Sequence, residues 1–150
     1  MKLYSKQEAI ARMNMLAGCS KSFVFLIDYS QEQVYVEETA EVSPEELIYN
    51  LNGFTNEAVA GLTDELLPES LPEQIEWIGH VKKNILAGNS FLTNLTCRTP
   101  VQTNLTLKDI YCNSRALYKV WVKNRFVVFS PEIFVRIKKG IISSYPMKGT

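Results

Sequence analysis

Histidine and cysteine are scarce in this 150-residue sequence, and their scarcity narrows the chemistry that the chain can carry. His80 is the only histidine, so a metal site built from several histidines is excluded. Its neighbours are typical of a helix surface, and we expect no catalytic role for it. Cys19, Cys97 and Cys112 are odd in number and far apart, which favours free, buried thiols over disulfides or metal ligands.

Net charge and long apolar runs are missing as well. The 16 basic and 16 acidic residues cancel, so the sequence offers no basic stripe for a nucleic-acid backbone. The longest apolar run, residues 23–27, is too short to cross a bilayer, and residues 1–8 are polar where a signal peptide is apolar. The sequence therefore predicts a cytoplasmic globular protein that binds neither nucleic acid nor membrane.

Several patterns in the sequence indicate helices. A capping box, in which an acidic residue follows a serine or threonine by three positions, marks helix starts at Ser5 and Thr106. The segment 43–46 is a third helix-start signal, with Pro44 at the first helical position. Apolar residues at helical spacing indicate a further helix that ends at Gly88. These signals predict helices near residues 5–17, 72–87 and 107–116.

Strand signals fall between these helices. Aromatic and β-branched residues separated by short polar turns predict hairpins over residues 22–37 and 119–145. Alternation at Phe91, Thr93 and Leu95 predicts one more strand, whereas glycine, proline and polar residues over 51–71 indicate loop. Helices and antiparallel hairpins without a strand–helix–strand rhythm predict an α+β fold.

Three stretches, in this order, carry a family resemblance: GNSFLTNLT at residues 88–96, SPEIF at 130–134 and YPMKGT at 145–150. They resemble the N-L-T strand, the S-P-E-x-F turn and the P-I-[KA]-G-T motif of the chorismate-binding family, which includes anthranilate synthase and aminodeoxychorismate synthase. Softer matches lie at residues 25–29 and 52–54. The resemblance covers essentially the whole chain, but only the first half or less of a typical family member.

The resemblance implies that residues 1–150 are the N-terminal portion of a chorismate-binding domain whose C-terminal portion is absent. The implied fold is part of an anthranilate-synthase-type antiparallel β-sandwich with flanking helices. Because this sandwich would be incomplete, we expect an exposed apolar face or edge. The family's magnesium-binding acidic residues have no counterpart here, so Mg²⁺ is expected only in the full-length parent.

Lys148 distinguishes between members of the family. The resemblance implies that enzymes making anthranilate, isochorismate or salicylate carry alanine at this position, whereas aminodeoxychorismate synthases carry lysine. In the latter the lysine is the catalytic nucleophile, attacking C2 of chorismate before ammonia adds at C4. Gly149 would allow close approach of the backbone to the substrate, and the Thr150 hydroxyl would bind it.

The sequence thus favours component I of aminodeoxychorismate synthase, in the pathway to para-aminobenzoate and folate. Its expected partners are chorismate and a glutamine amidotransferase subunit that supplies ammonia, and we expect the 150-residue chain to be inactive alone. Component I of anthranilate synthase is the enzymatic alternative. A third possibility is a non-catalytic module that binds a tryptophan-like ligand between residues 23–27 and 126–129.

Overall fold

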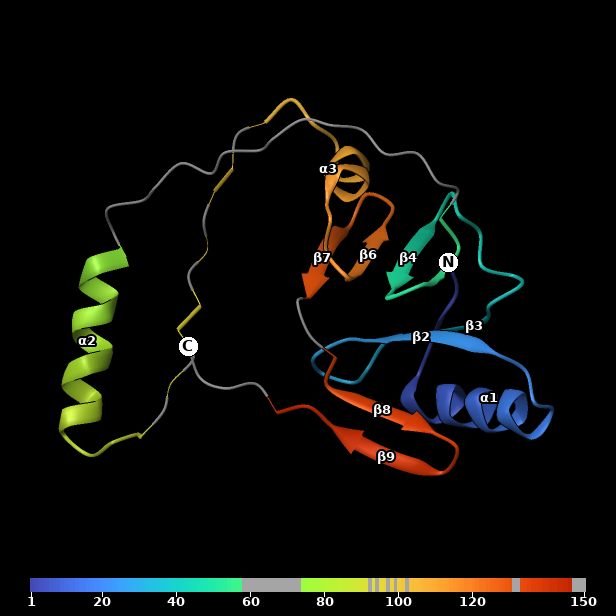
Figure 1. Cartoon of the computed structure of the whole chain (residues 1–150), viewed down its shortest axis with the longest axis horizontal. Coiled ribbons are helices and arrows are strands. Elements are labelled where there is room, and N and C mark those ends of the chain that lie inside the picture. The colour runs from blue at the N-terminus through green and yellow to red at the C-terminus, as the bar shows by residue number, and fades with distance from the viewer. Residues whose placement is uncertain are drawn as a thin grey trace. The chain divides into compact units, whose positions relative to one another are not determined.

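The computed structural model describes most of the chain and divides it into two units (Figure 1). One unit comprises Met1–Thr63 and Leu105–Thr150, and the other comprises Asp64–Asn104. Helices and antiparallel strands are combined in one chain, so the predicted α+β class is confirmed. The described residues are 1–57, 74–91, 93, 95, 96, 98, 100, 101, 103–130 and 133–146.

The first sheet of the larger unit has the strand order β1-β3-β2 and is antiparallel. Its strands are β1 (Leu3–Tyr4), β2 (Phe23–Ile27) and β3 (Val34–Glu38), and β2 and β3 form the hairpin predicted for residues 22–37. Helix α1 (Lys6–Gly18) packs against β3. Ala9 and Leu16 of α1 are buried with Val34 and Val36 of the sheet, which is what joins the two layers.

The predicted capping box at Ser5 is confirmed. The Ser5 hydroxyl accepts the Glu8 amide, and the Glu8 carboxylate accepts the Ser5 amide at 2.9 Å. These bonds satisfy amide groups that have no partner inside the helix. Because the Ser5 hydroxyl and the Ser5 amide donate hydrogen bonds to the ionised carboxylate, the pKa of Glu8 lies below its ordinary value.

The second sheet of this unit has the strand order β5-β4-β6-β7, again antiparallel. Helix α3 (Leu107–Asn113) begins at the predicted Thr106 capping box, and its Tyr111 is buried with Ile48 and Trp121 of the sheet. A separate cluster buries Tyr35 of the first sheet with Leu47 and other residues of the second, so the two sheets share a core. The strands are β4 (Leu47–Leu51), β5 (Phe54–Thr55), β6 (Tyr118–Val122) and β7 (Phe126–Ser130).

The helix expected to start at residues 43–46 is wrong. The Ser43 carbonyl accepts the amides of Glu46 and Leu47, both at 3.0 Å, so a single turn forms and then stops. The chain continues instead as β4, because Leu47 and its two successors are buried in the sheet and pair with β6. Burial of β-favouring side chains here overrides the local helix signal.

A third, two-stranded sheet pairs β8 (Val135–Lys138) with β9 (Ile141–Ser144). Hairpins are therefore present over the predicted range 119–145, as β6–β7 and β8–β9 in two different sheets. Ile137, Ile141 and Ile142 are 69%, 68% and 70% exposed. Among the described residues, this hairpin thus carries exposed apolar side chains, as expected.

In the smaller unit, α2 (Gln74–Leu86) ends just before Gly88, whose positive φ of 77° allows the chain to turn away. His80 lies on this helix and is exposed, as predicted. The strand expected at 91–95 is wrong for its described residues, 91, 93 and 95. A strand needs a partner for its backbone groups, and the described part of this unit contains no second strand.

The cysteines fit the prediction only in part. Cys19 and Cys112 are free thiols, but Cys19 is exposed rather than buried because it follows the last turn of α1 at the surface. Cys112 is partly buried against the Tyr111 cluster, and Cys97 lies outside the described residues. No helix among the described residues is long and apolar enough to span a membrane.

Tyr35 makes the core sensitive to alkali. It is 4% exposed, and burial, with the nearby Glu37 and Glu46 carboxylates, raises the pKa of Tyr35 to about 12. An unfolded tyrosine ionises at about pH 10, so this contribution to stability is complete below about pH 10 and is lost as the pH rises towards 12.

We therefore expect Tyr35→Phe to flatten the fall in unfolding free energy above about pH 10, as measured by urea denaturation at several pH values. The control is Tyr29→Phe, since Tyr29 is fully exposed. An unchanged alkaline slope in Tyr35→Phe would contradict the burial of an uncharged phenol at this position.

Candidate functional site

The three predicted site residues, Lys148, Gly149 and Thr150, lie outside the described residues, and their roles stay predictions. The structure does describe the hairpin that leads to them. The Tyr145 amide donates to the Phe134 carbonyl at 3.2 Å, so the β8–β9 pairing continues one step beyond β9. The backbone is therefore fixed by a ladder up to Tyr145, three residues before the predicted nucleophile.

The β8–β9 turn consists of Lys139 and Gly140, which connect the paired residues Lys138 and Ile141. Both turn residues have positive φ, at 52° and 76°. This is the geometry of a two-residue type I′ turn, whose twist matches that of the flanking strands. The turn therefore sets the register of the strand that leads toward Lys148.

A groove of about 660 Å³ lies in the larger unit between β2 and the β4–β5 hairpin. Tyr49 is buried in its wall, whereas Phe54 is 78% exposed at its edge. Lys21 contributes a positive charge and pairs with Glu38 at 2.9 Å. Aromatic walls with a few polar groups suit a flat aromatic ligand. The full lining is Lys21, Ser22, Phe23, Val24, Phe25, Thr39, Tyr49, Leu51, Phe54 and Thr55.

The groove matches the lining predicted for a tryptophan-like ligand on one side only, and the ligand itself stays a prediction. Residues 23–25 line the groove as predicted, but residues 126–129 do not line it. The second wall comes from β4 and β5; the sequence had indicated loop for β5 and a helix start just before β4. The Asn52-Gly53 turn, with both residues at positive φ, places this wall.

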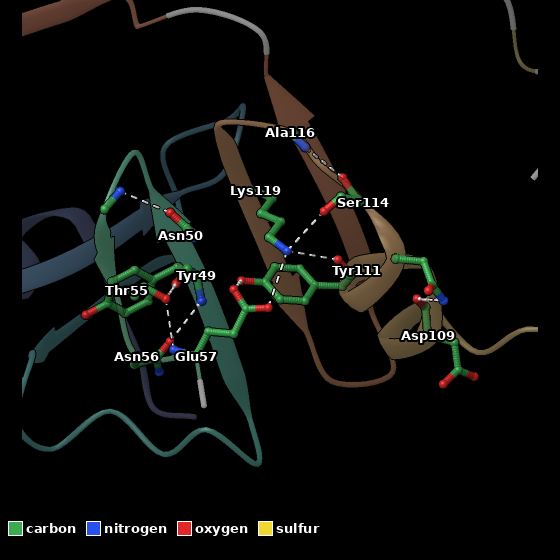
Figure 2. A network of polar contacts seen from close by, with 12 residues as sticks. Tyr49, Asn50, Thr55, Asn56, Glu57, Asp109, Tyr111, Ser114, Ala116 and Lys119 are labelled. Carbon is green, nitrogen blue, oxygen red and sulfur yellow. Dashed lines mark hydrogen bonds and ion pairs between the residues drawn. The ribbon is translucent and has the colours of Figure 1, made fainter. Parts of the chain in front are cut away.

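A buried polar network, which the sequence did not reveal, surrounds Lys119 of β6 (Figure 2). The Lys119 ammonium group donates to the Glu57 carboxylate at 3.3 Å and to two carbonyls at the end of α3. It also lies 4.3 Å from the centre of the Tyr111 ring. Lys119 is only 6% exposed, so its charge depends on these partners.

Tyr111 completes the network. Its hydroxyl donates to the second oxygen of the Glu57 carboxylate at 3.4 Å (Figure 2). Burial, reinforced by the Glu57 charge, raises the pKa of Tyr111, so its hydroxyl stays a neutral donor. The sequence held only a weak indication that Lys119 is buried. Lys119 and Trp121 are two positions apart, so on a strand they lie on the same face, and a face that buries tryptophan is not one where a solvated lysine is expected.

A metal site in the described part of the chain would need several ligand side chains close together. Within it, no three histidine, cysteine or acidic side chains gather as ligands around one point. Magnesium prefers several oxygen ligands in near-octahedral geometry. The Mg²⁺ that the resemblance implies for the full-length parent stays a prediction.

Comparison with known proteins decides the family. Residues 6–150 match the family described as chorismate binding enzyme. The chain belongs to the chorismate-binding enzyme family. The family resemblance inferred from the three ordered motifs is therefore confirmed. The family match includes both units of the structure and the β8–β9 hairpin.

Two curated relatives of the chain are uncharacterized PabA-like proteins. The one from Pasteurella multocida is 35% identical over 149 residues, which cover 94% of this chain and 45% of the relative. The one from Haemophilus influenzae is 32% identical over 150 residues, which cover 96% of this chain and 45% of the relative. The chain thus spans somewhat less than half the length of both. No solved structure matches it.

The β8–β9 turn can be tested directly in this chain. Gly140→Ala places a Cβ at a φ of 76° and should cost about 1–2 kcal/mol, loosening the hairpin before Lys148. Exchange of the β8 and β9 amides, followed by NMR, measures the effect. Gly79→Ala is the control, because Gly79 lies within α2 with open space around it and should gain stability. Equal exchange in Gly140→Ala and the parent chain would contradict the assigned turn.

Proposed function

We propose that this chain is the N-terminal portion of component I of an aminodeoxychorismate synthase, with Lys148 as its nucleophile. One observation carries the proposal: a chain of the chorismate-binding family has lysine in the P-M-K-G-T motif. Its relatives' PabA-like names are consistent with the para-aminobenzoate pathway. A glutamine amidotransferase subunit would be its partner and would supply ammonia.

The proposed reaction has two displacement steps. The Lys148 amine forms a bond to C2 of chorismate, the two conjugated ring double bonds shift toward C4, and the 4-hydroxyl leaves as water with the proton that the amine nitrogen releases. Ammonia then forms a bond to C4, both double bonds shift back, and the bond between C2 and the Lys148 nitrogen breaks, with a proton from the added ammonia restoring the lysine amine. A covalent intermediate divides one difficult substitution into two easier ones.

Lys148 can attack only when its amine is unprotonated. A free lysine has a pKa of about 10.4, so it is almost entirely protonated at neutral pH. Desolvation in a closed pocket lowers a lysine pKa and releases the lone pair. In this proposal the full-length protein supplies that pocket, Gly149 lets the backbone approach the substrate, and the Thr150 hydroxyl donates a hydrogen bond to it. Mg²⁺ would bind a chorismate carboxylate through residues outside this chain.

Anthranilate synthase is the closest competing enzyme activity. The resemblance implies alanine at position 148 for that reaction, which leaves space for a different nucleophile. Lys148 would occupy that space, so amination at C4 is favoured over anthranilate formation.

The first test uses the full-length protein. Lys148→Ala should lower aminodeoxychorismate formation from chorismate and ammonium by about a hundredfold or more, because the covalent route is lost, while chorismate still binds. Lys138→Ala is the control, since Lys138 is an exposed lysine at the end of β8. A Lys148→Ala enzyme that kept the full rate would refute the proposal. One that made anthranilate would identify Lys148 as the residue that selects the position of amination.

The second test uses the 150-residue chain by itself. We expect no aminodeoxychorismate from chorismate, ammonium and Mg²⁺, because the implied metal-binding and pocket segments are not part of this chain. Product should be sought by chromatography, with the full-length protein as the positive control. Turnover by the isolated chain that a chelator abolishes would show that it holds a complete site.

The groove between β2 and β4–β5 supports a second candidate function, binding of a tryptophan-like ligand. Calorimetry should show tryptophan binding to the 150-residue chain, and Phe54→Ala should weaken it about tenfold by removing one aromatic wall. Phe134→Ala is the control, because Phe134 is equally exposed, at 81% against 78%, but does not line the groove. Equal weakening by both variants, or no binding at all, would rule out this ligand here.

A further inference from the structure

Lys119 has all three of its ammonium donors engaged. They go to Glu57 at 3.3 Å, to the Tyr111 carbonyl at 3.2 Å and to the Ser114 carbonyl at 3.2 Å. Lys119 is buried and Glu57 is partly buried, with side-chain exposures of 7% and 16%. A buried charge with a complete set of acceptors holds its neighbours in one geometry.

The carbonyls that Lys119 binds lie at the end of α3. The last carbonyls of a helix have no partner inside it and carry its negative dipole end. The Ser114 amide reaches the Tyr111 carbonyl at 3.3 Å, and Lys119 adds a positive charge to the same oxygen. Lys119 therefore binds carbonyls at the C-terminal end of α3 and pairs with Glu57 at the same time.

Glu57 comes from a distant part of the sequence. It is 54 residues from Tyr111 and 62 from Lys119. Hydrogen bonds also hold the preceding residue, Asn56, against β4. Its side-chain oxygen accepts a hydrogen bond from the Tyr49 amide, and its side-chain nitrogen donates one to the Leu47 carbonyl, both at 2.9 Å. In this way Asn56 continues the pairing of β4 beyond β5.

These contacts lie where the chain leaves and rejoins the larger unit. The chain leaves that unit after Thr63 and returns at Leu105, so Glu57 precedes the excursion and Tyr111 follows it. The described residues that make these contacts, which Figure 2 shows, belong to the larger unit. The network thus joins chain segments that precede and follow residues 64–104 in the sequence.

We propose that Lys119, Glu57 and Tyr111 form a polar clamp, which fastens together the chain segments entering and leaving residues 64–104 and can open without unfolding the sheets. An apolar cluster of equal volume would also fill this space, but it would not fix the direction of each contact. The charged pair does so, because the ammonium must meet three acceptors at once. This clamp is independent of the reaction proposed for Lys148.

Hydrogen exchange of the 150-residue chain tests the clamp. Lys119→Met retains the length of the side chain but removes its charge. Exchange at the amides of Ile110, Ser114 and Glu57 should become about tenfold faster or more, as expected for loss of a charge-assisted hydrogen bond. Amides of the β2–β3 ladder should change less than about twofold.

Lys21→Met is the matched control. Lys21 also pairs with a glutamate at 2.9 Å, but its side chain is 54% exposed, so its loss should leave the clamp amides unchanged. If Lys119→Met instead accelerates exchange equally in the clamp and in the β2–β3 ladder, the network only stabilises the whole unit, and the clamp is refuted. Unchanged exchange everywhere would refute it as well.

Glu57→Gln covers the case in which Lys119→Met does not fold. It removes the negative charge but keeps an acceptor for Lys119, so the expected acceleration is local and smaller than in Lys119→Met. Combining the two substitutions should recover part of the lost protection, because neither charge is then left buried without its partner. A Glu57→Gln chain with unchanged protection at Ile110 and Ser114 would overturn the proposal.

Discussion

The pairing of β4 with β6 is the constraint on which the larger unit depends. Five residue pairs, from Leu47↔Val122 to Leu51↔Tyr118, join two segments that are far apart in the sequence. Closing so long a loop costs conformational entropy, which burial on both sides of the ladder offsets. On one side, Leu47 and Val122 are buried with Tyr35 of the first sheet, and on the other, Ile48 and Trp121 are buried with Tyr111 of α3.

Two further features follow from this ladder. Once β4 and β6 are paired, β5 and β7 occupy the edges of the sheet through short turns. The β5 edge forms one wall of the aromatic groove, and the segment after it brings Glu57 to Lys119. Residues 64–104 lie in the sequence between Glu57 and Tyr111, two members of this polar network. The groove and the clamp are consequences of one long-range pairing.

Local sequence patterns correctly predicted the helices whose first turn is stabilised by residues close together in the sequence. The Ser5 and Thr106 capping boxes formed, because serine or threonine and its acidic partner satisfy each other within one turn. The similar pattern at Ser43 did not produce a helix, because Leu47, four residues later, is stabilised by burial in strand β4. Asn52-Gly53 formed a hairpin turn rather than loop, and β5 was too short to recognise as a strand.

The buried state of Lys119 could not be predicted, because its acceptors come from Glu57 and from the end of α3 and meet only in the folded chain. The family, in contrast, was readable from ordered motifs, since motif residues are specified by the chemistry they perform. Three such stretches over residues 88–150 sufficed to predict it, and the match over residues 6–150 confirmed it. The site residues Lys148, Gly149 and Thr150 were likewise inferred from a motif and remain to be tested by chemistry.

The most direct measurement is mass spectrometry of the full-length protein after mixing with chorismate in the absence of ammonia. If Lys148 attacks C2 as the 4-hydroxyl leaves, the peptide that contains residues 145–150 should gain the mass of chorismate less one water, with the modification on the Lys148 amine. Addition of ammonia should then remove the modification as aminodeoxychorismate forms. An enzyme that forms aminodeoxychorismate while Lys148 stays unmodified, and does so equally well as Lys148→Ala, would contradict the account.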